Sequence, residues 1–179
     1  PIVLMALLFG VLGSMMGNVA EQAPVKPTVG VVTLDHGRLA NPSLQVVNAT
    51  ASVAYNGTSV DAALQAVQGK SGIAVLSIPA NFTASIMGDR PASIEVYWIM
   101  RGAGLLDSIS SSTVDALITR IGQTISAYLI GQGVTLSPNV VLAPVRPIST
   151  TYFHNMVMEG VSPSTLGNVL SSQSLIIPL

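Results

Sequence analysis

Two glycine-containing segments have the residue types of nucleotide-binding loops. Gly69-Lys70-Ser71 matches the end of a phosphate-binding P-loop, but that motif needs a glycine where Leu64 stands and must lead from a strand into a helix. Gly102-Ala103-Gly104 stands where a dinucleotide fingerprint would begin, but Asp107 replaces the third glycine and would repel a pyrophosphate. We therefore interpret both segments as turns and expect no cofactor.

The other reactive side chains are too scattered to predict a catalytic or metal site. Asp35 and His36 could form an acid–base pair, but we interpret them as an exposed loop histidine beside a turn-forming aspartate. The chain has no cysteine, and its second histidine, His154, is far from the first in the sequence. A serine nucleophile elbow is also missing. We predict no catalytic residue, no metal ligand and no enzymatic activity.

Three Asn-x-Thr sequons are candidate modification sites. Their acceptor residues are Asn48, Asn56 and Asn81. N-linked glycans at these residues would place this part of the chain outside the cytoplasm. Because the chain is rich in Ser, Thr and Asn, sequons also arise by chance, so we treat all three as possible glycosylation sites only.

The composition is unusual for a soluble domain. Only 8% of the 179 residues are charged, whereas about 25% are charged in an ordinary soluble protein. The seven basic and eight acidic residues give a net charge of −1 and form no basic stripe, which excludes a nucleic-acid partner. The mean hydropathy of +0.61 points to a membrane neighbour or to a surface of uncharged polar residues.

Both ends of the chain are apolar. As a helix, residues 1–16 would be about 24 Å long, slightly less than the roughly 30 Å core of a bilayer. A secretory leader would need a basic segment before this run and a small-x-small cleavage site after it, and neither is visible. We predict that residues 1–17 are the outer part of a first transmembrane helix and that residues 175–179 begin a second. Two buried core segments of a soluble domain, or a processed leader, are the alternatives.

The central region alternates between strand and helix patterns. Residues 18–27, with two prolines, form a linker, and an α/β domain follows at 28–134. Ile94, Val96 and Trp98 alternate with residues of the opposite face, as in a strand. The pattern predicts about four strands in a largely parallel sheet, with flanking helices and one long helix after the fourth strand. The expected strands are 28–34, 52–55, 72–78 and 93–100, and the expected helices are 39–47, 58–69, 81–87 and 112–131.

Residues 135–174 have a different character. Pro138, Pro144 and Pro147 should interrupt any long element, and Pro163 should begin a last short helix that ends near residue 172. We interpret this segment as an extension that packs back toward the membrane and against the α/β core. An interfacial position for its tyrosine and phenylalanine is the alternative.

The order of these elements resembles the permease subunits of type-2 ABC transporters. The apolar start, Pro-Ile-Val-Leu-Met-Ala-Leu-Leu-Phe-Gly, is similar to their first transmembrane helix, and Val29-Gly30-Val31-Val32 to their first extracytoplasmic strand. Residues 60–82 are similar to the family's short helix, strand and Ile-Pro-x-x-Phe turn, and residues 88–96 to the Pro-Ala strand that follows a glycine. The resemblance implies structural roles for Pro79, Phe82 and Gly88.

The resemblance also implies a location and partners. The chain would be an extracytoplasmic domain of a multi-pass cell-membrane protein, with the bilayer at both ends. It would cap or gate the outer mouth of an export path, usually in a dimer with a second permease subunit. A separate cytoplasmic ATPase subunit would hydrolyse the ATP. A membrane-anchored structural or adhesive surface domain, and an extracytoplasmic small-ligand sensor domain, are the alternatives.

Overall fold

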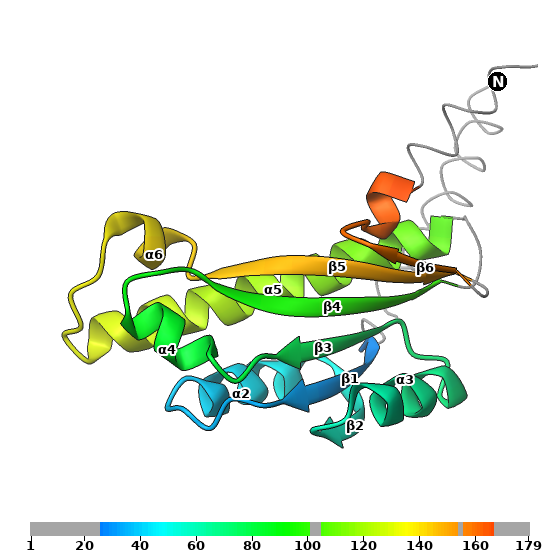
Figure 1. The fold of residues 1–179 in the computed structure, drawn as a ribbon, viewed down its shortest axis with the longest axis horizontal. Helices are drawn as coiled ribbons and strands as arrows, with labels where there is room; N and C mark the ends of the chain where they lie inside the picture. The colour runs from blue at the N-terminus through cyan, green and yellow to red at the C-terminus, as the bar shows by residue number, and fades with distance from the viewer. Residues whose placement is uncertain (1–25, 101–104, 154–155, 167–179) are drawn as a thin grey trace, which may run out of the picture.

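The computed structural model describes residues 26–100, 105–153 and 156–166, with side chains described from 111 onward in the long helix (Figure 1). The predicted membrane segments, 1–17 and 175–179, lie outside these residues. In chain order, the elements are β1 (Thr28–Thr33), α2 (Ala40–Thr50), β2 (Ser52–Gly57), α3 (Val60–Gly69), β3 (Ala74–Ile78), α4 (Phe82–Met87), β4 (Ala92–Met100), α5 (Leu105–Gly131), α6 (Pro138–Leu142), β5 (Val145–Phe153) and β6 (Met156–Glu159).

The strands form one mixed sheet of six strands in the order β2-β1-β3-β4-β5-β6. The prediction of about four strands in a largely parallel sheet is therefore wrong, although the α/β class, the flanking helices and the long helix after the fourth strand are confirmed. Strand β1 is parallel to β2 and β3, whereas β4 is antiparallel to β3. The six-residue helix α4 rises only about 9 Å, which is too short to carry the chain back along the sheet. Strand β4 therefore starts beside the end of β3 and runs in the opposite direction.

Strands β5 and β6 lie in the segment where prolines were expected to interrupt regular structure. Pro147 pairs with Ile94 in the parallel β4–β5 ladder, but β6 pairs with β5 only from Thr150 onward. The nitrogen of Gly160 donates to the oxygen of Ser149, so odd-numbered residues of β5 direct their backbone groups toward the β6 side. The ring nitrogen of Pro147 therefore faces an edge where no strand pairs with it, and the missing N–H interrupts no ladder.

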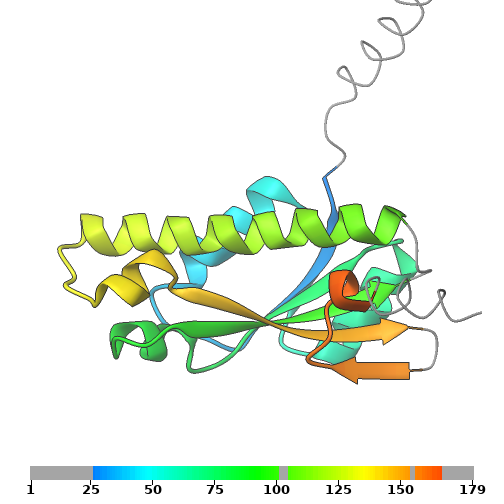
Figure 2. The ribbon, with the colours of Figure 1, turned by 90° about the horizontal axis from the view of Figure 1, so that it is seen from above.

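Helices cover the two faces of the sheet unequally (Figure 2). Helices α2 and α5 lie on one face, and α3 covers β1–β3 on the other. One face of the long helix is apolar, because Val114, Ile121 and Ile125 are buried against the even-numbered residues of β4. The helix begins at Leu105, earlier than its predicted start at residue 112.

Helix α3 forms a smaller core on its own face. The side chain of Ser59 accepts a hydrogen bond from the nitrogen of Ala62 and so caps this helix. Leu64 and Val67 pack on β1 and β3, and a Cβ atom at Gly30 would lie 2.8 Å from a methyl carbon of Val67. Glycine at this position therefore allows the close approach of helix and strand.

Candidate functional site

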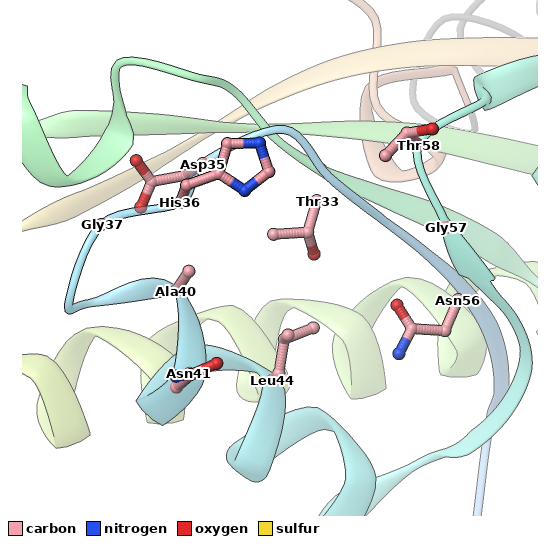
Figure 3. A pocket seen from close by; sticks show the side chains of 10 residues that line it. All are labelled: Thr33, Asp35, His36, Gly37, Ala40, Asn41, Leu44, Asn56, Gly57 and Thr58. Atoms are coloured by element: carbon pink, nitrogen blue, oxygen red, sulfur yellow. The ribbon is translucent and has the colours of Figure 1, made fainter.

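The chain forms a crevice where β1 and β2 end. The connection after β1 enters α2 on one face of the sheet, and the connection after β2 enters α3 on the opposite face. Neighbouring parallel strands whose connections diverge in this way leave a gap at their carboxyl ends, and this edge of an open α/β sheet is where ligands bind. Here the gap is a cavity of about 390 Å³ (Figure 3), lined by Thr33, Asp35, His36, Gly37, Ala40, Asn41, Leu44, Asn56, Gly57 and Thr58.

One wall of the crevice is held by the buried carboxylate of Asp35. The hydroxyl of Thr83, just inside α4, donates a hydrogen bond to this carboxylate and accepts one from the backbone nitrogen of Leu39 at 3.3 Å. A Cβ atom at Gly37 would lie 2.3 Å from the side chain of Thr83, so only glycine fits in the connecting loop. These contacts fix the loop after β1 against both α2 and α4.

Asp35 differs from its prediction. It is only 4% exposed and hydrogen-bonded, rather than part of an exposed turn. Its partner Thr83 is 48 residues away, so local sequence could not indicate the contact. His36 is exposed, as predicted. Figure 3 shows the Asp35 carboxylate directed away from Thr33 and Asn56, with the His36 imidazole lying toward Thr33.

Uncharged polar groups make up most of the remaining lining. Asn41, Asn56 and Thr58 are exposed at its rim, and Leu44 is half-buried. The Oγ1 atom of Thr33 is buried and has no hydrogen-bond partner. Sequence reasoning missed Thr33, Asn41 and Thr58 as lining residues. Thr58 had a local signal, because polar residues follow the predicted strand 52–55. Thr33 and Asn41 lie inside a predicted strand and a predicted helix, so they had none.

The predicted site residues fall into two groups. The three sequon asparagines are all exposed: Asn48 on α2, Asn56 on the crevice and Asn81 just before α4. Their glycosylation stays a prediction. Of the motif residues, Pro79 follows β3, Phe82 is fully buried in the large core, and Gly88 follows α4.

The other candidate motifs form no site in the described part of the chain. Gly69 is the last residue of α3, and Lys70 and Ser71 form the turn that follows, with Ser71 at a φ of 56°. Gly102-Ala103-Gly104 and His154 lie outside the described residues. Within those residues, no three His, Asp or Glu side chains could hold a metal ion together.

A tyrosine cluster lies on the α3 side of the sheet. The rings of Tyr97 and Tyr152 have centroids 6.2 Å apart, and the hydroxyl of Tyr97 donates to a carboxylate oxygen of Glu95 at 2.8 Å. Burial, together with this bond and the negative charge of Glu95, raises the pKa of Tyr97 to about 12. Tyr97 is therefore neutral at physiological pH, and the cluster presents a hydrogen-bonded phenol rather than a reactive phenolate.

The fold and its crevice define an α/β domain of the open-sheet type, and one solved structure shares this fold closely. A crystal structure described as a "domain of a putative ABC type-2 transporter" from Thermotoga maritima MSB8 matches with a TM-score of 0.74 and 25% sequence identity. The match covers 82% of this chain and 99% of that chain. No protein-family model matches the sequence, and no curated protein does. The predicted resemblance to type-2 ABC transporters is confirmed by this structural neighbour.

The described helices themselves do not cross a membrane. Even the longest of them lacks the sustained apolar character that a bilayer span requires, and the same holds for every other helix in residues 26–100, 105–153 and 156–166. The predicted membrane segments, 1–17 and 175–179, lie outside this part of the chain.

Proposed function

We propose that this chain is the extracytoplasmic domain of the permease subunit of an ABC-type export system. The observation that carries the proposal is the structural match to a transporter domain, which extends over 99% of that domain. Such a domain would cap or gate the outer mouth of the transport path. It would need no catalytic residue, because ATP would be hydrolysed by a separate cytoplasmic subunit.

The arrangement of the described ends supports this proposal. In both ribbon views, the start of β1 and the last described segment, residues 163–166, lie toward the end of the long axis where α5 begins (Figures 1 and 2). The predicted membrane segments precede and follow these two ends in the sequence. A bilayer at that end would leave the crevice, at the carboxyl ends of β1 and β2, pointing away from the membrane.

The proposed partners are a cytoplasmic ATPase subunit, a second permease subunit in a dimer, and the lipid bilayer. A small-ligand sensor domain is the second candidate function, and the crevice is the observation that favours it. A sensor would pass its signal to a signalling module, whereas an export permease would need ATP hydrolysis.

Purification of the tagged full-length protein from its native membranes tests the proposal. We expect an ATP-hydrolysing polypeptide to co-purify in mild detergent, and the same tag on an unrelated membrane protein of the same cells is the control. Recovery of the protein with a signalling kinase, or without any ATP-hydrolysing partner, would contradict the permease assignment.

A further inference from the structure

The crevice between β1 and β2 is lined by groups that both donate and accept hydrogen bonds. The hydroxyl of Thr58 and the carboxamides of Asn41 and Asn56 have this property. Ligand hydroxyl groups have the same double capacity. We propose that this crevice binds a small, neutral, polyhydroxylated molecule of the size of one sugar unit. This inference goes beyond the export role and does not depend on it.

The size and position of the crevice fit such a ligand. Its volume of about 390 Å³ lies within the range of small-molecule sites, roughly 300–1,000 Å³. It lies outside the carboxyl ends of two parallel strands, the edge at which open α/β sheets bind ligands. The side chains of Ala40 and Leu44 add an apolar wall against which the C–H groups of a sugar ring can pack.

The charge of the lining argues against ionic ligands. No Lys or Arg lines the cavity, so a phosphate or carboxylate group would meet no counter-charge. The single carboxylate, that of Asp35, is bonded by Thr83 and directed away from the cavity centre, so a cation would not find a set of oxygen ligands (Figure 3). A neutral ligand avoids both problems.

The strongest support for a ligand in this crevice is the hydroxyl of Thr33. Its oxygen is buried and has no hydrogen-bond partner, although other atoms of Thr33 line the cavity between His36 and Asn56 (Figure 3). A buried hydroxyl without a partner destabilises the folded chain. Rotation about χ1 moves this oxygen to another staggered position, and from a position that faces the cavity it would bond a ligand hydroxyl.

Ligand-observed NMR on the purified full-length protein tests the proposal. The probes are D-glucose, D-galactose, D-mannose and N-acetyl-D-glucosamine, and inorganic phosphate is the ionic comparison. We expect saturation transfer to at least one sugar. Inorganic phosphate has no carbon-bound protons, so its binding is followed by the ³¹P line width, which we expect to stay unchanged. Thr33→Val and Asn56→Ala should each weaken that sugar's binding tenfold or more. Asn48→Ala, an exposed asparagine of α2 outside the lining, should not change it.

The Thr33→Val variant distinguishes the loss of a ligand contact from the loss of folding. Thr33→Val keeps the shape of the side chain and removes only an unpartnered group, so its melting temperature should be unchanged or higher. Absence of binding for all four sugars, binding that survives both substitutions, or binding of phosphate instead would overturn the proposal. Methyl glycosides identify the source: equal binding assigns the terminal unit of a glycan, and a preference for the free reducing sugar assigns a free monosaccharide.

Discussion

Two buried threonine hydroxyls, one on β1 and one on β5, differ in their hydrogen bonding. On β5, the fully buried Thr151 donates its hydroxyl to the backbone oxygen of Val161 at 2.6 Å. On β1, the hydroxyl oxygen of Thr33 is buried without a partner. Because an unpaired buried hydroxyl costs about 1–3 kcal/mol, folding explains the first threonine but not the second. The crevice beside Thr33 offers an explanation, since a ligand would complete its hydrogen bonding.

The largest expected loss of stability concerns the large core, where Phe82 anchors α4. Phe82→Ala should lower the free energy of unfolding by roughly 3 kcal/mol, because it leaves a cavity in the large core where α4 is anchored. Thermal and denaturant unfolding measure the change. Val157→Ala, at the half-exposed β6 on the other end, is the control and should change stability by less than about 0.5 kcal/mol. A Phe82→Ala shift within noise would refute the anchoring role.

The next effect concerns the wall of the crevice. Thr83→Val should lower the free energy of unfolding by about 2 kcal/mol, because it removes a hydrogen bond to the buried carboxylate of Asp35 and another from the nitrogen of Leu39. Thr119→Val provides a matched control, since its hydroxyl bonds only the exposed backbone of α5. Equal effects of the two substitutions would show that the Asp35 contact does not hold the loop.

Substitution of Thr151 and of Thr33, each on its own, should have smaller effects on stability that differ from each other. Thr151→Val should lower the free energy of unfolding by about 1 kcal/mol, because the oxygen of Val161 loses its partner. Thr33→Val should leave stability unchanged or raise it. Denaturant unfolding of the two variants, measured side by side, checks the difference. A comparable loss in both would mean that Thr33 has a partner in the folded protein and would remove the basis of the comparison.

The smallest effect is on the tyrosine cluster, away from both threonines. The pKa of Tyr97 is raised to about 12, whereas an unfolded tyrosine titrates near 10. The folded state therefore holds this proton longer, and the resulting stability is present below pH 10 and is lost as the pH rises toward 12. Phenolate absorbance, compared between the natural chain and Tyr97→Phe, measures the titration. Glu95→Gln should lower the pKa, and an unchanged titration would refute the role of Glu95.

Local patterns predicted the elements whose residues repeat regularly. The alternation of Ile94, Val96 and Trp98 identified β4, and the stripe from Val114 to Leu129 identified most of α5. The cap of α3 is equally local, because Ser59 accepts its hydrogen bond from Ala62, three residues on. In each case the determining contacts lie within one turn of a helix or along one strand.

The missed features depend on contacts between distant segments. Strand β5 contains Pro147 and several polar residues, and it is a strand because β4 supplies a parallel partner on one side. Asp35 is buried because Thr83 reaches it from α4. The crevice likewise needs the ends of β1 and β2 to be neighbours, which the sequence order alone does not state.

Chemical labelling in intact cells tests the central claim, that this domain stands outside the cytoplasm, most directly. The chain has no cysteine, so single substitutions report one position each. Thr58→Cys marks the crevice end and Val157→Cys the opposite end, both exposed, while Ser43→Cys is a buried control. We predict that a membrane-impermeant maleimide labels the two exposed cysteines in intact cells and leaves Ser43→Cys unlabelled. Labelling of the exposed positions only after the cells are permeabilised would contradict the claim.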